Sequence, residues 1–162
     1  MQTRNTRGGA NEKPKLEKVV GVYDDHDLGE NDAGRDFAVA RFLYEDIGEN
    51  RRSIGYLGTA MQGEIYDSYV HSIDAHYTSS SGKVIVDTQL INSDRDDAEG
   101  YGAIFDLMYA VNSSLRHKFE VEYMDEQVNF SDLGFLRRNN YAQMRYIMLY
   151  NKQNLTERIK NY

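Results

Sequence analysis

Carboxylate side chains gather at close spacing in two parts of the sequence, and oxygen ligands at such spacing can bind calcium. The first group is Asp94, Asp96, Asp97 and Glu99. The second group is Asp24, Asp25, Asp27, Glu30 and Asp32. Neither group has the central glycine and terminal glutamate of the common calcium loop. We therefore predict no bound metal, and the first group remains the best candidate should calcium bind.

A second candidate site is the run Asp132-Leu133-Gly134-Phe135-Leu136-Arg137-Arg138. In a carbohydrate-binding site, Phe135 would be a stacking platform, and the two arginines would donate hydrogen bonds to hydroxyl groups. The candidate binding residues are Asp132, Phe135, Arg137 and Arg138. In the alternative interpretation Gly134 makes a turn, Phe135 packs on the protein, and the arginines pair with acidic side chains.

The remaining titratable residues suggest little catalysis. His71 and His76 are an odd number of residues apart, so in a strand they lie on opposite faces and cannot share a metal. Glu120 and Glu122 share a face and could serve as acid and base, but a ladder of charges lining a wet interior is the commoner arrangement. The chain has no Gly-x-Ser-x-Gly turn and no phosphate-binding loop. Whether it is an enzyme stays open, and no cofactor is predicted.

Composition narrows the class of protein. The 162 residues include 13 Tyr and 6 Phe but a single Pro, and aromatic side chains favour strands. With no Cys, the chain has no disulfide, no thiolate metal site and no cysteine nucleophile. The net charge of −7 argues against a nucleic-acid partner. No apolar run approaches the ~20 residues of a spanning helix.

Polar and apolar side chains alternate with a period of two residues along most of the chain, and helical periodicity is nearly absent. We predict an all-β fold, an antiparallel up-and-down meander of eight or nine strands. Residues 1–18 are expected to form a polar lead-in. The strands are expected at residues 19–23, 36–45, 53–62, 69–78, 83–91, 102–111, 116–124, 142–151 and 155–162.

Strand length and loop length both favour a membrane β-barrel. Most expected strands have about ten residues, close to the ~9–11 of a tilted membrane-spanning strand. Short turns are expected at residues 46–52, 79–82, 112–115 and 152–154. Longer connections are expected at residues 24–35, 92–101 and 125–141. Short turns at one rim and long loops at the other are typical of outer-membrane barrels.

The alternation also separates two faces. One face is apolar and nearly free of formal charge, and we expect it on the convex, lipid-facing side. Its expected members are Phe42, Tyr44, Phe105, Leu107, Tyr109, Phe119, Val121, Tyr123, Met144 and Tyr146. The expected lumen-facing charges are Arg41, Asp106, Lys118, Glu120, Glu122 and Arg145. A soluble sandwich or barrel with an apolar core gives the same alternation, so this alternative stays open.

Five segments, in this order and spacing, resemble those of a bacterial family of unknown function, DUF5916. They are residues 36–41, 53–59, 71–77, 93–94 followed by 99–103, and 130–140, the last reading Phe-Ser-Asp-Leu-Gly-Phe-Leu-Arg-Arg-Asn-Asn. Asn140 stands where the family usually has Asp. In that family a carbohydrate-binding-like domain precedes a large outer-membrane β-barrel. The resemblance covers about two thirds of the chain, and residues 19–162 would be part of such a barrel.

The resemblance implies an outer-membrane location in a Gram-negative bacterium and a role in binding or passage of carbohydrate at the cell surface. The implied partners are outer-membrane lipid and oligosaccharide. One alternative is a membrane-associated hydrolase acting on carbohydrate, and another is a soluble structural β domain. Because nine strands would leave the barrel unclosed, we expect an open curved sheet, a fragment whose remaining strands lie outside this chain.

Overall fold

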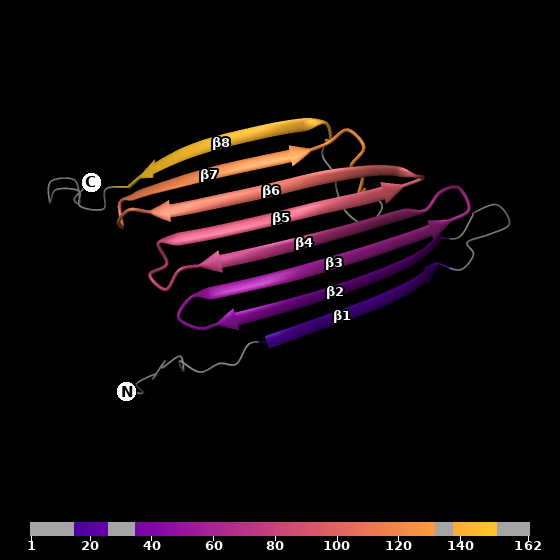
Figure 1. Cartoon of the computed structure of the whole chain (residues 1–162), viewed down its shortest axis with the longest axis horizontal. Helices are drawn as coiled ribbons and strands as arrows, with labels where there is room; N and C mark the ends of the chain where they lie inside the picture. Colours follow the sequence, from indigo (N-terminus) through magenta and orange to yellow (C-terminus); the bar gives the residue numbers. More distant parts are fainter. Residues whose placement is uncertain (1–14, 26–34, 132–137, 152–162) are drawn as a thin grey trace, which may run out of the picture.

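The computed structural model describes residues 15–25, 35–131 and 138–151. As the alternation of side chains predicts, these residues form eight long strands. The strands form one open antiparallel sheet in which each strand is hydrogen-bonded to its neighbour in sequence (Figure 1). Their bounds are β1 Lys15–Asp25, β2 Arg35–Ile47, β3 Arg51–Gly63, β4 Ser68–Thr78, β5 Val84–Arg95, β6 Ala98–Ala110, β7 Leu115–Met124 and β8 Tyr141–Tyr150.

The predicted fold class, an all-β open meander, is confirmed. Eight of the nine expected strands are present near their expected places, and the ninth, at residues 155–162, lies outside the described residues. The strand β1 begins at Lys15, so the expected polar lead-in is partly strand. Leu16 stands between the charged residues Lys15 and Glu17, as alternation requires, but Lys18 breaks the pattern by placing a charge on the face of Leu16.

The expected long connection at residues 92–101 is wrong. Strand β5 continues to Arg95 and β6 begins at Ala98, so Asp96 and Asp97 alone make the turn. Both residues have positive φ values, 55° and 61°, as a two-residue turn of type I′ requires. Asp tolerates this backbone conformation, so two aspartates can form a tight turn. The acidic cluster was interpreted as a long loop, whereas it contains a β-hairpin. The rim that was expected to have only long connections therefore also has one two-residue turn.

The strands are strongly staggered across the sheet. A row of directly paired residues starts at Val19, in the middle of β1, and ends at Tyr141, the first residue of β8. It passes through Arg41, Leu57, Ser72, Ile91, Gly102 and Met124. Between β1 and β8 the strands are thus displaced in one direction overall, although β2 with β3 and β7 with β8 pair over their full lengths, and the strands slope relative to a line across the sheet. A slope of this kind accompanies closure in barrels.

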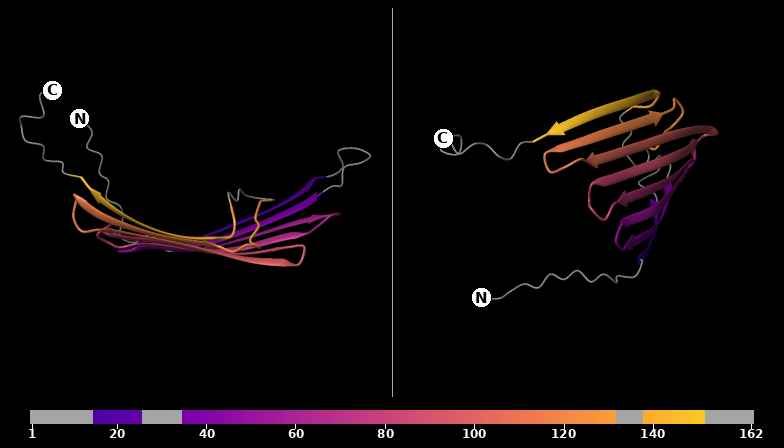
Figure 2. Two further views of the ribbon diagram at one scale, coloured as in Figure 1. Left: turned by 90° about the horizontal axis from the view of Figure 1, so that it is seen from above. Right: turned by 60° about the vertical axis from the view of Figure 1, so that its left-hand side comes forward.

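The connection between β7 and β8 covers part of one face. Val128, which is fully buried, packs there against Ile91 and Met124. Gly100 permits the close approach, because a Cβ atom at that position would lie 2.1 Å from the backbone nitrogen of Val128. Figure 2 shows that the strands bow and that this connection rises from the hollow side of the sheet. The face that carries Ile91 and Met124 is therefore the concave face.

Candidate functional site

A row of ionisable side chains crosses all eight strands on the concave face. Direct pairing links, in order, Lys15, Glu45, Ser53, His76, Asp87, Asp106, Glu120 and Arg145. We call these eight residues the charged row. All of its members except Ser53 are titratable. A row of this kind needs water or countercharges on its face, since a charge is costly in an apolar environment.

Ion pairs and hydrogen bonds connect the charged row to its surroundings. Arg51 Nη2 lies 2.7 Å from Glu45 Oε1, and His76 Nδ1 lies 2.5 Å from Asp87 Oδ1. Glu120 forms ion pairs with Lys118 and Arg145 and keeps only 13% of its side-chain surface exposed. Most other partners are well exposed, and exposed pairs of this kind each contribute ~0–1 kcal/mol to stability. Their main effect is to keep opposite charges close together on this face.

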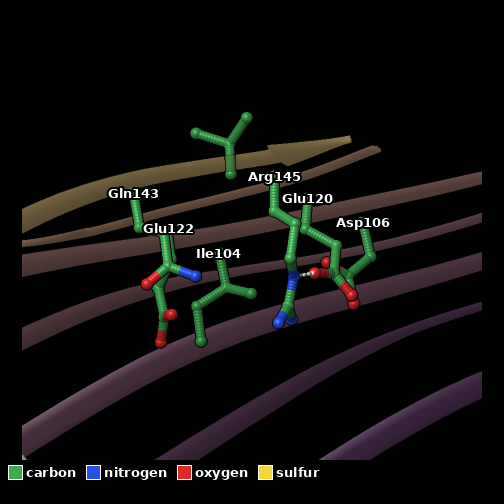
Figure 3. Close-up of a pocket in the computed structure, with 7 residues that line it drawn as sticks. Ile104, Asp106, Glu120, Glu122, Gln143 and Arg145 are labelled. Carbon is green, nitrogen blue, oxygen red and sulfur yellow. Dashed lines mark hydrogen bonds and ion pairs between the residues drawn. The ribbon is translucent and has the colours of Figure 1, made fainter. Parts of the chain in front are cut away.

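An open pocket of about 210 Å³ lies between β6, β7 and β8 on the concave face. Its lining is Ile104, Asp106, Glu120, Glu122, Gln143 and Arg145, together with Val121, whose side chain belongs to the opposite face. Figure 3 shows the labelled side chains extending to the same side of the strands, with Arg145 directed at Glu120. Three carboxylates, one amide and one guanidinium therefore offer both donors and acceptors to a ligand.

The convex face has the opposite chemistry. The row next to the charged row is Leu16, Tyr44, Ile54, Ala75, Thr88, Phe105, Val121 and Met144. We call these eight residues the apolar row, and none of them is charged. Leu16 and Met144 are each 72% exposed, and Ile54 is 53% exposed. Nothing in the described part of the chain covers these side chains.

Further aromatic and aliphatic side chains extend the exposed convex surface along the strands. They include Phe42, Ile73, Tyr77, Leu90, Tyr109, Tyr123, Tyr146, Met148 and Tyr150. Two charged residues on this face, Lys18 and Arg52, have partners. The Lys18 amino group lies 5.7 Å from the centre of the Phe42 ring, and Arg52 pairs with Asp46 at 2.8 Å beside the β2–β3 turn. The centre of the convex surface is apolar.

Two histidines of the convex face, His71 and His117, are each hydrogen-bonded to a tyrosine on an adjacent strand. His71 Nδ1 lies 2.7 Å from the hydroxyl of Tyr56, and His117 Nδ1 lies 2.6 Å from the hydroxyl of Tyr146. In both pairs the rings are also stacked. Each pair satisfies polar atoms among apolar neighbours, where an unpaired polar group would be costly.

The six charged residues expected to face a lumen share one face of the sheet. Arg41, Asp106, Lys118, Glu120, Glu122 and Arg145 all lie on the concave face. The ten expected convex residues all lie on the opposite face. The separation of His71 and His76 to opposite faces also follows from the pairing, since His71 is opposite Gly58 and His76 is opposite Ser53.

Only part of the candidate carbohydrate site can be placed. The Arg138 guanidinium lies 5.0 Å from the centre of the Tyr141 ring, beside the start of β8. Asp132, Phe135 and Arg137 lie outside the described residues. The choice between a sugar site and a structural connection at residues 132–138 therefore stays a prediction.

The candidate calcium residues are divided by the β5–β6 hairpin. Asp94 and Glu99 are directly paired across the two strands, whereas Asp96 and Asp97 form the turn. Glu99 also accepts a hydrogen bond of 3.1 Å from the Asn92 amide. Within the described ranges, no group of three or more His, Cys, Asp or Glu side chains is placed to hold a metal ion.

Four titratable members of the charged row were not among the expected lumen-facing charges: Lys15, Glu45, His76 and Asp87. Residue parity within the expected strands could have found Glu45, His76 and Asp87, whereas Lys15 lies in the expected polar lead-in. Parity alone does not align one strand with the next, however. The register between strands, fixed in the structure, is what brings the four residues into one row.

Comparison with known proteins found no match among family models, curated proteins or solved structures. Among the residues that the structure describes, there is no helix long and apolar enough to cross a membrane.

Proposed function

We propose that this sheet is part of the wall of an outer-membrane β-barrel, with the convex face toward lipid and the concave face toward a wet interior. As the resemblance to the DUF5916 family implies, the protein would act in the binding or passage of carbohydrate at the surface of a Gram-negative cell.

The observation that carries the proposal is the contrast between the apolar row and the charged row. The two rows are adjacent in register and cross the same eight strands, yet one has no charge and the other has seven titratable side chains. A charge on the lipid face of a barrel costs ~2–4 kcal/mol at the middle of the bilayer. The apolar row avoids this cost, and a wet interior accepts the charged row.

Strand geometry supports the same proposal. The strands have 10 to 13 residues, enough for a tilted strand to cross the ~30 Å hydrocarbon layer. The stagger from Val19 to Tyr141 supplies the slope that barrel strands have. A soluble sheet would need a second layer over the exposed apolar row, and the described part of the chain provides none.

The two edge strands of the sheet, β1 and β8, have backbone groups that need hydrogen-bond partners in a membrane. Among the described strands, β1 is paired only with β2, and β8 only with β7. Backbone groups without partners are not tolerated in hydrocarbon. The proposal therefore requires additional strands to pair with both edges in the membrane.

The carbohydrate part of the proposal is supported by the concave pocket. Asp106, Glu122 and Gln143 present acceptors, and Gln143 and Arg145 present donors, on an open surface. Sugar hydroxyls are both donors and acceptors, so a mixed set of this kind suits them. Arg138 and Tyr141, at the start of β8, could extend such a surface.

A refolding experiment tests the membrane assignment. The 162-residue chain is diluted from urea into buffer or into phosphatidylcholine vesicles and then separated on a density gradient. We expect the chain to float with the vesicles and to show the circular dichroism of a β-sheet there, and to aggregate in buffer. A soluble monomer with a cooperative thermal transition in buffer would contradict the proposal.

A further inference from the structure

His76 lies between a carboxylate and a hydroxyl on the concave face. Its Nδ1 atom is 2.5 Å from Asp87 Oδ1, and its Nε2 atom is 2.9 Å from Thr78 Oγ1. An ionised carboxylate can only accept, so the Asp87 contact places the ring proton on Nδ1. The Nε2 lone pair is then free to accept a hydrogen bond from the Thr78 hydroxyl. A hydroxyl, an imidazole and a carboxylate in this order form a nucleophile, a base and a group that orients the base.

The sheet fixes this arrangement by its regular geometry. His76 and Thr78 are two residues apart in β4, so both side chains are on the same face. Asp87 of β5 is directly opposite His76. The His76 and Asp87 side chains are 36% and 54% exposed, which leaves the group open to a dissolved molecule.

We propose that Thr78, His76 and Asp87 form an acyl-transfer site that hydrolyses carboxylic esters. This activity is independent of the proposed carbohydrate role. Thr78 and His76 would be the catalytic residues, and Asp87 a positioning residue that keeps the Nδ1 proton in place.

In the first half of the reaction, Thr78 Oγ1 attacks the ester carbonyl carbon and its proton passes to His76 Nε2. The bond from that carbon to the alcohol oxygen then breaks, and the proton moves from Nε2 to the leaving oxygen, so that the alcohol departs. In the second half, water attacks the acyl group on Thr78 and gives a proton to Nε2. The bond to Oγ1 breaks, the proton returns to Thr78, and the carboxylic acid leaves.

The developing negative charge on the carbonyl oxygen needs a donor nearby. Arg51 of β3 is directly opposite Thr78, and its side chain points to the same face, where it pairs with Glu45. It is the cation that the register puts closest to Thr78 across β3. The site lies on an open polar face, so its substrate would be a water-soluble ester rather than a buried acyl chain.

The test uses p-nitrophenyl acetate as substrate and a fluorophosphonate as covalent probe, with the full chain refolded in detergent. We expect hydrolysis above the buffer rate and a probe adduct on Thr78 by mass spectrometry. His76→Gln and Thr78→Val should each lower the rate by about 10²-fold or more, and Thr78→Ser should retain it. Asp87→Asn should lower kcat and leave KM unchanged, and Asp87→Glu should restore part of kcat.

The control is His71→Gln, which alters a histidine of the opposite face and should leave the rate unchanged. Circular dichroism of each variant shows whether the sheet has formed. The proposal is overturned if all folded variants hydrolyse the ester equally, or if no adduct forms on Thr78. It is also overturned if Thr78→Val remains active while His76→Gln does not, because the histidine would then act alone.

Discussion

Phe105 and Asp106 are consecutive residues of β6, yet they belong to rows of opposite chemistry. Phe105 is directly opposite Val121 in the apolar row, and Asp106 is directly opposite Glu120 in the charged row. Because side chains of a strand alternate, one step along the chain separates the exposed aromatic face from the ionic one. Substitutions at such neighbouring positions can therefore test the two faces against each other.

A charge on the apolar row should weaken the membrane-bound state. We expect Met144→Arg to lower the free energy of unfolding in vesicles by about 2–4 kcal/mol, since Met144 would face lipid. Gln143→Arg is the matched control, because Gln143 is the neighbouring residue on the concave face and should change stability by less than about 1 kcal/mol. Urea titration in vesicles measures both. Equal effects of the two substitutions would count against a lipid-facing convex surface.

The close contact at Gly100 predicts a specific intolerance. An added Cβ would lie 2.1 Å from the backbone of Val128, and backbone cannot give way as a flexible side chain can. We expect Gly100→Ala to destabilise the chain by about 1–3 kcal/mol and to expose residues 125–131 to protease. Gly48→Ala, whose added Cβ would meet its nearest atom at 3.4 Å, is the control. Unchanged cleavage in Gly100→Ala would show that the connection does not pack as described.

The positive φ values of the turn at Asp96 and Asp97 predict which substitutions at Asp97 the chain tolerates. Asp97 has a φ of 61°, which β-branched residues adopt poorly. We expect Asp97→Val to lower the free energy of unfolding by about 1–2 kcal/mol, and Asp97→Gly to be neutral or stabilising. Chemical denaturation of both variants measures the difference. If valine were as stable as glycine at this position, the assigned turn would be incorrect.

Much of the fold could be predicted from the sequence, because the strands are regular and a parity rule separates their two faces. In β7, for example, alternation alone assigns Phe119 and Glu120 to opposite faces of the sheet. The hairpin at Asp96 could not be predicted, since the flanking Asp94 and Glu99 looked like a loop. The contact of His76 with Asp87 depends on the register of β4 against β5, which alternation within one strand does not encode.

The concave pocket predicts a separation of binding from stability. Glu120 makes two ion pairs and its side chain is only 13% exposed, so Glu120→Gln should lower the free energy of unfolding by about 1–2 kcal/mol while the sheet still forms. If the pocket binds sugars, the same substitution should lower affinity for oligosaccharides by several fold in calorimetric titration. Glu45→Gln, at the other side of the charged row, is the control. If the unaltered chain, Glu120→Gln and Glu45→Gln bound oligosaccharides with equal affinity, the pocket would not be the carbohydrate-binding site.

The most direct measurement of the central claim uses tryptophan, which the chain lacks. Met144→Trp and Gln143→Trp each introduce one fluorophore, on the convex and concave faces of the same strand. In vesicles of brominated phosphatidylcholine, a lipid-facing convex surface predicts strong quenching of the tryptophan at position 144 and weak quenching at position 143. Equal quenching at the two positions, or none at position 144, would contradict the assignment of the convex face to lipid.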